Sequence, residues 1–146
     1  MDPVTALSLV VNTFQLIDYG ISATKSLLEV SKAGSTEANA RLDQEALTLS
    51  SSTSSLTAQL NTLRGGHNEL DADQRQLASI AERCDELSND LLRHLNAIKV
   101  KSSMRKRDVV EGWVRGLMLK PKIEGIHKEL IRNQSLMNTN MLANVW

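Results

Sequence analysis

The sequence predicts an all-α fold: an elongated antiparallel bundle of four to five long helices. Apolar residues recur at spacings of three and four over long stretches, which is typical of amphipathic helices. The chain also has only two prolines and 3% aromatic residues. Sheets favour aromatic residues and need frequent turn signals, so this composition disfavours a β protein. With 146 residues, the chain is long enough for one core, and we expect a single domain over residues 1–146.

The first predicted helix covers residues 1–33 and is unusually apolar. Asp2 is a favoured N-cap residue, Pro3 suits the first helical position, and Gly34 ends the helix. One face is expected to hold residues at a spacing of three and four, namely Leu7, Val10, Phe14, Ile17, Ile21 and Leu28. Four more apolar residues widen this face, namely Leu9, Val11, Leu16 and Leu27.

The next two predicted helices, residues 35–64 and 71–101, carry heptad patterns and form an antiparallel hairpin. The seam of the first of these is Leu42, Ala46, Leu49, Thr53, Leu56, Leu60 and Leu63. The seam of the second is Leu77, Ile80, Cys84, Leu87, Leu91, His94 and Ile98. The serine-rich run 50–55 lies inside the first heptad pattern. We therefore interpret it as a face of small residues that permits close approach, in preference to a low-complexity or phosphorylated segment.

The last predicted segment, residues 106–146, is a helix that is kinked near Pro121, since proline removes one helical hydrogen bond. Helices of this length are stable in water chiefly when they pack along their whole length. A long, narrow bundle follows from this requirement.

No catalytic constellation can be assembled from the sequence, so we expect no enzyme activity, no cofactor and no small-molecule substrate. The three histidines lie far apart and form no H-E-x-x-H motif, so we expect no metal site. Cys84, the lone cysteine, falls on an apolar stripe and is interpreted as a small buried hydrophobe. Because a lone cysteine cannot form an internal disulfide, the sequence favours a reducing compartment.

The net charge of zero hides an uneven distribution. Residues 1–90 carry a net charge of −7, and residues 91–146 carry +7. This split favours either attraction between the two halves of the bundle or a surface with two poles. A basic cluster stands out, namely Lys99, Lys101, Arg105, Lys106 and Arg107. It is either a solvated helix end or a site for anionic lipid headgroups. Nucleic acid is disfavoured, because no recognition motif accompanies the charge.

The first helix has two interpretations, which hold in different states of the protein. It forms the centre of the resting bundle, or it leaves the bundle and enters a bilayer. Asn12, Gln15 and Asp18 interrupt its apolar run, which disfavours a secretory signal and a permanent membrane span. We therefore expect a cytoplasmic protein that reaches the plasma membrane only after activation. The candidates for membrane insertion are Val4, Leu7, Leu9, Val10, Val11, Phe14, Leu16, Ile17 and Ile21.

Short motifs along the chain resemble one known family. They are the opening M-D-P-x-T-A-L-S-L, the segment from Val10 to Gly20 that ends in Q-L-I-D-Y-G, and the turn from Lys32 to Ser35. The tail pattern also fits, namely Trp113, Lys122, Ile123, Glu124, Leu130 and Arg132. Together these features are similar to the fungal N-terminal domain of STAND/NACHT receptors of the NLR type, a HeLo-like or SesA-like helical domain. The resemblance covers nearly the whole chain.

This resemblance implies a role in fungal cell-death signalling and non-self recognition (heterokaryon incompatibility). It also implies oligomerisation, followed by membrane insertion of the N-terminal helix, here Asp2 to Ile21. No NACHT module follows Trp146 in this sequence. We therefore expect either a domain separated from its receptor or a free-standing protein activated in trans. The alternative to a membrane effector is an adaptor domain that only binds proteins, either another copy or an NLR-type partner; the heptad patterns also suit such a module.

Overall fold

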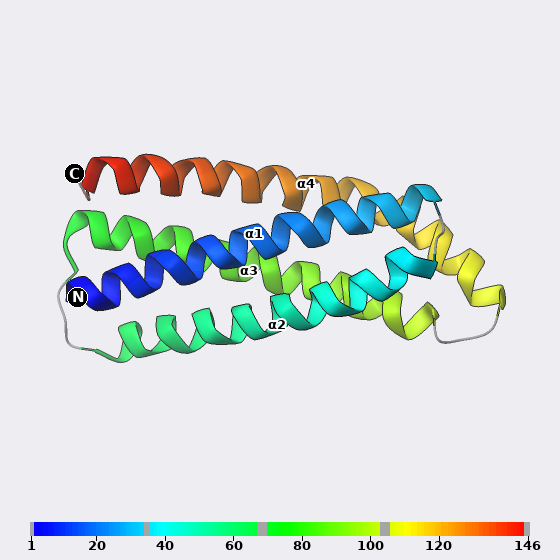
Figure 1. Ribbon diagram of the computed structural model, residues 1–146, viewed down its shortest axis with the longest axis horizontal. Helices are drawn as coiled ribbons and strands as arrows, with labels where there is room; N and C mark the ends of the chain where they lie inside the picture. Colours follow the sequence, from blue (N-terminus) through cyan, green and yellow to red (C-terminus); the bar gives the residue numbers. More distant parts are fainter. Residues whose placement is uncertain (1, 34–35, 67–69, 103–105, 145–146) are drawn as a thin grey trace.

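The computed structural model describes residues 2–33, 36–66, 70–102 and 106–144, with side chains described over 2–29, 41–66, 70–97 and 119–140. This part of the chain contains four α-helices and no strand (Figure 1). The helices are α1 (Pro3–Ala33), α2 (Thr36–Gly65), α3 (Ala72–Ser102) and α4 (Lys106–Asn144). The predicted all-α fold is therefore confirmed.

The four helices run alternately in opposite directions and form one elongated bundle (Figure 1). Each of α1, α2 and α3 spans 30 or 31 residues, which corresponds to a length of about 45 Å. Helix α1 packs against α2, α4 and α3, and α3 packs against α2 and α4. The start of α1, the end of α2, the start of α3 and the end of α4 lie at the same end of the bundle (Figure 1). We call this the N-terminal end.

Polar side chains fix where α1 and α3 begin. The Thr5 N–H donates to Asp2 Oδ1 at 2.7 Å, so Asp2 is the N-cap of α1. At α3, the Gln74 N–H donates to Asp71 Oδ1 at 2.8 Å, and the Asp71 N–H donates to Gln74 Oε1 at 3.3 Å. This reciprocal pair is a capping box, and it places the start of α3 within the predicted region.

The heptad seams predicted for α2 and α3 lie in the core. In α2, Leu42, Leu49, Thr53, Leu56 and Leu60 are buried, and Ala46 and Leu63 are partly buried at its edge. In α3 the buried seam residues are Leu77, Ile80, Cys84, Leu87 and Leu91. His94 is half-buried, and the side chain of Ile98 lies outside the described residues. The helix also continues through the serine-rich run, whose exposed members are Ser50, Ser51, Ser54 and Ser55.

The core stripe of α1 differs from the predicted one. The buried residues with a 4-3-4-3-4 spacing are Leu9, Thr13, Leu16, Gly20, Ala23 and Leu27. Of the predicted face, Val10 and Ile17 are buried, as are three of the four residues expected to widen it, namely Leu9, Leu16 and Leu27. Phe14, Ile21 and Leu28 are only partly buried, and Leu7 and Val11 are exposed. The reason is the close approach of α1 and α4: a Cβ on Gly20 would lie only 2.8 Å from Leu130 Cδ1. A small residue, Gly20, therefore lies where α1 faces Leu130 of α4.

Pro121 lies inside α4 and does not end it. Because proline has no N–H, the helical hydrogen bond to the carbonyl of residue 117 is missing there. The first, yellow part of α4 is inclined to the orange and red remainder (Figure 1). The remainder packs on the core through Ile123, Ile126, Leu130 and Met137.

Candidate membrane-binding surface

The outward face of α1 changes character along its length. Its first turns expose apolar side chains, with Val4 78%, Leu7 59% and Val11 45% accessible. Further along, the exposed positions are Gln15, Asp18, Tyr19, Ser22, Lys25 and Glu29. Single exposed apolar residues are common, but three within two turns of one helix make a local apolar patch. We call Val4, Leu7 and Val11 the apolar tip.

The structure divides the nine predicted insertion residues into three groups. The apolar tip is at the surface, and Phe14 and Ile21 are partly buried at the edge of the core. Four others are buried in the bundle: Leu9, Val10, Leu16 and Ile17. In the folded bundle, therefore, only the tip is free to meet a membrane, and the remaining apolar surface of α1 becomes available only if α1 separates from the other helices.

Helix α1 is long and apolar enough to cross a bilayer by length and composition. Within the segment Pro3–Glu29, a window of 18 residues has a mean hydropathy of 1.3, and a third of that window is buried inside the bundle. A core helix of a soluble protein passes the same test, because a bundle interior and a bilayer select the same residues.

A cavity of about 460 Å³ opens beside the apolar tip, where α1, α3 and α4 meet. Leu7, Val10, Leu77 and Met137 supply its apolar lining. Asp71 and Asp73, at the start of α3, also line it. The pKa of the nearby Asp2 carboxyl is lowered, first because it accepts a hydrogen bond from the Thr5 backbone N–H. This end of α1 therefore combines an apolar surface with carboxylates.

Helix α1 is joined to its neighbours mainly through hydrogen bonds in which at least one of the two groups is uncharged. Toward α2, Asn12 Nδ2 donates to Gln59 Oε1 at 2.8 Å. Further along, the Ser22 and Ser26 hydroxyls both donate to Glu45 Oε1, at 3.0 and 2.9 Å. The Arg41–Glu29 ion pair, at 3.9 Å between exposed side chains, contributes little.

Toward α4, Gln134 Nε2 donates to Asp18 Oδ1 at 3.1 Å. Thr24 Oγ1 lies 2.8 Å from His127 Nδ1, and it donates its own proton to the Ile21 carbonyl at 2.8 Å. The hydroxyl has one proton, so both contacts are made at once only in the tautomer in which His127 Nδ1–H donates to Thr24. The sequence analysis did not single out these polar partners. Their signal was the recurrence of Asn, Ser and Thr near the apolar stripe of the first helix.

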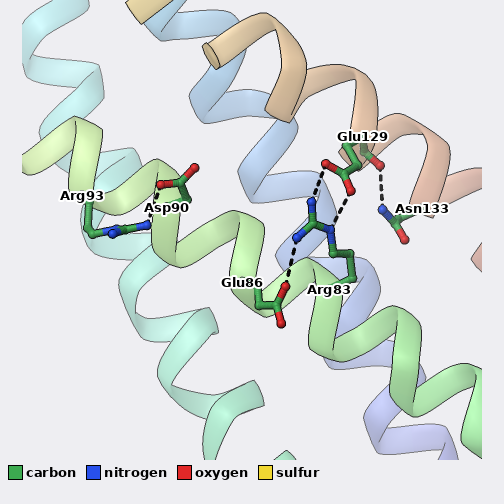
Figure 2. A network of polar contacts seen from close by, with 6 residues as sticks. All are labelled: Arg83, Glu86, Asp90, Arg93, Glu129 and Asn133. Carbon is green, nitrogen blue, oxygen red and sulfur yellow. Dashed lines mark hydrogen bonds and ion pairs between the residues drawn. The ribbon is translucent and has the colours of Figure 1, made fainter.

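Charged pairs join α3 to α2 and to α4. Arg83 on α3 makes a two-point contact with Glu129 on α4, with Nε to Oε1 at 2.6 Å and Nη2 to Oε2 at 2.9 Å (Figure 2). Arg83 Nη1 also donates to Glu86 at 2.9 Å. These hydrogen bonds, Glu129 first, raise the pKa of Arg83, and the Arg83 hydrogen bond lowers the pKa of Glu129.

On the other side of α3, Arg64 of α2 pairs with Glu82 at 2.9 Å. The Thr57 hydroxyl donates to both oxygens of Asp85, at 2.9 and 3.0 Å. Burial raises the pKa of the Asp85 carboxyl, and the Thr57 hydrogen bond opposes that rise. Short ion pairs therefore join α3 to α2 and to α4, whereas the one described ion pair of α1, Arg41–Glu29, is long and exposed.

The predicted anionic-lipid cluster lies far from the apolar tip. Lys99 and Lys101 belong to the last turns of α3, and Lys106 and Arg107 to the first turn of α4. Those turns are at the opposite end of the bundle from the start of α1 (Figure 1). Arg105 and the side chains of the other four residues lie outside the described residues. The two features proposed to meet a membrane are thus separated by about the length of a helix, roughly 45 Å.

Among the described residues, no three His, Cys, Asp or Glu side chains gather where they could hold a metal ion. Cys84 is fully buried, and burial raises its thiol pKa to about 12. A thiol in this environment stays protonated at neutral pH and is a poor nucleophile.

Comparison of the chain with family models, curated proteins and solved structures gives no significant match. The resemblance described above therefore remains a prediction from short motifs.

Proposed function

We propose that this chain is a non-enzymatic helical signalling domain that acts on a membrane through α1. The observation that supports this most directly is how α1 is attached. It is apolar enough to enter a bilayer, and among the described residues its one ion pair with a neighbouring helix, Arg41–Glu29, is long and exposed. Short ion pairs instead join α3 to α2 and to α4. Among the described residues, α1 is therefore the helix whose release breaks no short ion pair.

Release of α1 exchanges one apolar environment for another. Leu9, Leu16 and Ile17 are fully buried in the bundle and would be equally well removed from water among lipid tails. Asp18 opposes insertion, because a charge at mid-bilayer costs about 2.5–3.5 kcal/mol on insertion scales. Its partner Gln134 is lost on release. Association of several copies around a polar interior would reduce that cost, which is why the proposal includes self-association.

The proposed resting location is the cytoplasm, with movement to the plasma membrane on activation. The specific setting, fungal cell-death signalling and non-self recognition by an NLR-type receptor, rests on the sequence resemblance alone. The proposed action on membranes can be tested whether or not this biological setting is correct.

The test is dye release from lipid vesicles by the purified chain. Val4→Gln, Leu7→Gln and Val11→Gln together remove the apolar tip and leave the buried core unchanged. Ile131→Gln with Leu136→Gln is the matched control, since these two residues are also exposed and apolar but lie on α4. We expect the wild type and the control to release dye and the tip variant to lose most of this activity. Equal release by both variants, or none by a folded wild type, would rule out the role of α1.

The second candidate function is a docking adaptor without membrane activity. The cavity beside Leu7 favours it, because an apolar hollow next to an exposed apolar side chain suits a helix from a partner protein. If the chain is such an adaptor, the wild type releases no dye but co-purifies with its partner. The tip variant then no longer co-purifies with that partner.

A further inference from the structure

The outer surface between α1 and α2 carries no charge over much of its length. Residues 46–63 of α2 include no Asp, Glu, Lys or Arg, and neither do residues 3–17 of α1. The first acidic residue of α1 beyond this run, Asp18, is bonded to Gln134 on α4 and so faces away from α2. Charges bound the uncharged run of α2 on both sides, at Glu45 and at Arg64.

A groove of about 450 Å³ lies in this uncharged surface. Its walls include Gln15 and Tyr19 from α1 and Ser51 and Ser55 from α2. Leu47, which is 68% accessible, lines the same groove and projects from it. The surface therefore has both a hollow with short side chains and a protruding apolar side chain.

We propose that a second copy of this chain docks on this α1–α2 groove in a twofold arrangement. In such an isologous contact, the same patch of both copies must be complementary to itself. Leu47 of one copy fits the hollow of the other, and the reverse contact follows by symmetry. Depletion of charged residues is also the compositional signal of an interface core.

The chemistry of the groove selects a protein like itself over other occupants. A partner that buries a charge here would find no counter-charge, which is costly. A lipid tail would cover the polar groups of Gln15, Ser51 and Ser55 without offering them a hydrogen-bond partner, which is also costly. The same groups on a second copy are each donor and acceptor, so the two surfaces can satisfy one another.

The test is the oligomeric state of the full chain, measured by sedimentation velocity across a range of concentrations. Ser51→Lys places a charge in the groove, and Ser79→Lys makes the same exchange at an exposed position of α3, outside the groove. We expect wild type and Ser79→Lys to dimerise with the same affinity, and Ser51→Lys to bind itself at least about tenfold more weakly. Leu47→Ala should also weaken the dimer, without adding any charge.

A wild type that stays monomeric at every concentration would overturn the inference, as would equal dimerisation of the two lysine variants. If the wild type is monomeric and Ser51→Lys alone loses vesicle binding, the groove meets lipid and the inference is wrong. The inference does not require membrane activity. A chain that dimerises through this groove but releases no dye would contradict only the proposed membrane action, and the converse result would contradict only the dimer.

Discussion

Buried hydroxyl groups in this bundle differ in whether they have a hydrogen-bond partner. The Thr13 hydroxyl donates to the Leu9 carbonyl one turn earlier, at 2.7 Å, so a polar side chain can lie fully buried in the α1 stripe. Thr53 occupies a comparable seam position in α2, yet its hydroxyl oxygen has no hydrogen-bond partner among the described residues. An unsatisfied buried hydroxyl reduces stability, whereas a satisfied one is nearly neutral.

Thr53→Val should therefore raise the free energy of unfolding by about 1 kcal/mol, because it removes the unsatisfied hydroxyl and keeps the shape of the side chain. Thr13→Val is the matched control. It removes a hydroxyl whose hydrogen bond is made, so we expect no gain or a small loss. Urea denaturation followed by circular dichroism measures both. A larger gain for the Thr13 variant would mean that the Thr53 hydroxyl is satisfied in solution.

The Arg83–Glu129 pair gives one part of the stability a defined pH dependence. Its hydrogen bond to Arg83 lowers the folded-state pKa of Glu129 below the ordinary value of 4.5. The stabilisation is therefore fully present above pH 4.5, and it is lost as the pH falls through the lowered folded-state pKa. Because the Glu129 side chain is 35% accessible, solvent screening limits this contribution to about 1 kcal/mol or less.

Glu129→Gln should reduce the free energy of unfolding at neutral pH, and the difference from wild type should shrink as the pH falls below 4.5. Glu86→Gln is the control, since Glu86 also contacts Arg83 but from the same helix. It does not join two helices, so we expect a smaller effect. Thermal unfolding at several pH values checks both variants. A Glu129 effect that is constant with pH would show that the ion pair is not its cause.

At the scale of helices, the spacing of apolar residues was sufficient to identify the buried face of α2 and of α3, but not the whole buried face of α1. In α2 and α3 the large apolar residues themselves form the seam, so their spacing identifies the buried face. In α1 the buried stripe passes through Thr13, Gly20 and Ala23, and large apolar residues such as Phe14 lie at its edge. The apolar pattern therefore identified most of the large buried residues of α1, but it missed the small ones and included Leu7 and Val11, which are exposed. Which residues of α1 are buried depends on how closely α1 approaches α4, and this distance depends on the residues of both helices.

The close approach of α1 and α4 can be tested by comparing the stability of two glycine-to-alanine variants. Gly125 lies in α4 with nothing within 4 Å of an added Cβ, so Gly125→Ala should stabilise the protein by about 0.5–1 kcal/mol through helix propensity. Gly20→Ala gains the same propensity but places its Cβ 2.8 Å from Leu130 Cδ1. Overpacking of this kind costs about 1–3 kcal/mol. We expect the Gly20 variant to be less stable than the Gly125 variant by that amount, as measured by urea denaturation.

Equal stabilisation by the two alanines would mean that the end of the Leu130 side chain moves aside at no cost. A second substitution then separates packing from propensity: Leu130→Ala opens space above Gly20. In that background, Gly20→Ala should become more favourable than it is in the wild type, because the two positions are coupled by contact.

For the whole molecule, the charge split along the sequence does not translate into simple attraction between two halves. Arg64–Glu82 lies entirely within the acidic part of the sequence. Arg83–Glu129 joins a base of the acidic part to an acid of the basic part. The split instead concentrates charge locally, with the basic cluster at the end of the bundle opposite to the apolar tip (Figure 1). Sequence reasoning could identify both features, but not their separation, because only the directions of the helices determine it.

This separation predicts that the two features act at different stages of membrane binding. Replacing Lys99, Lys101, Lys106 and Arg107 by Gln should remove the preference for anionic vesicles, since each cation near such a surface contributes about 1 kcal/mol. The preference of the wild type should also decrease with added salt. Dye release from uncharged vesicles should persist in this variant, because it depends on α1. The tip variant should show the reverse: it should retain salt-sensitive association with anionic vesicles but lose dye release from both kinds. Loss of release from uncharged vesicles in the neutralised variant would mean that the basic end and α1 enter the membrane as one unit, which the folded bundle does not allow.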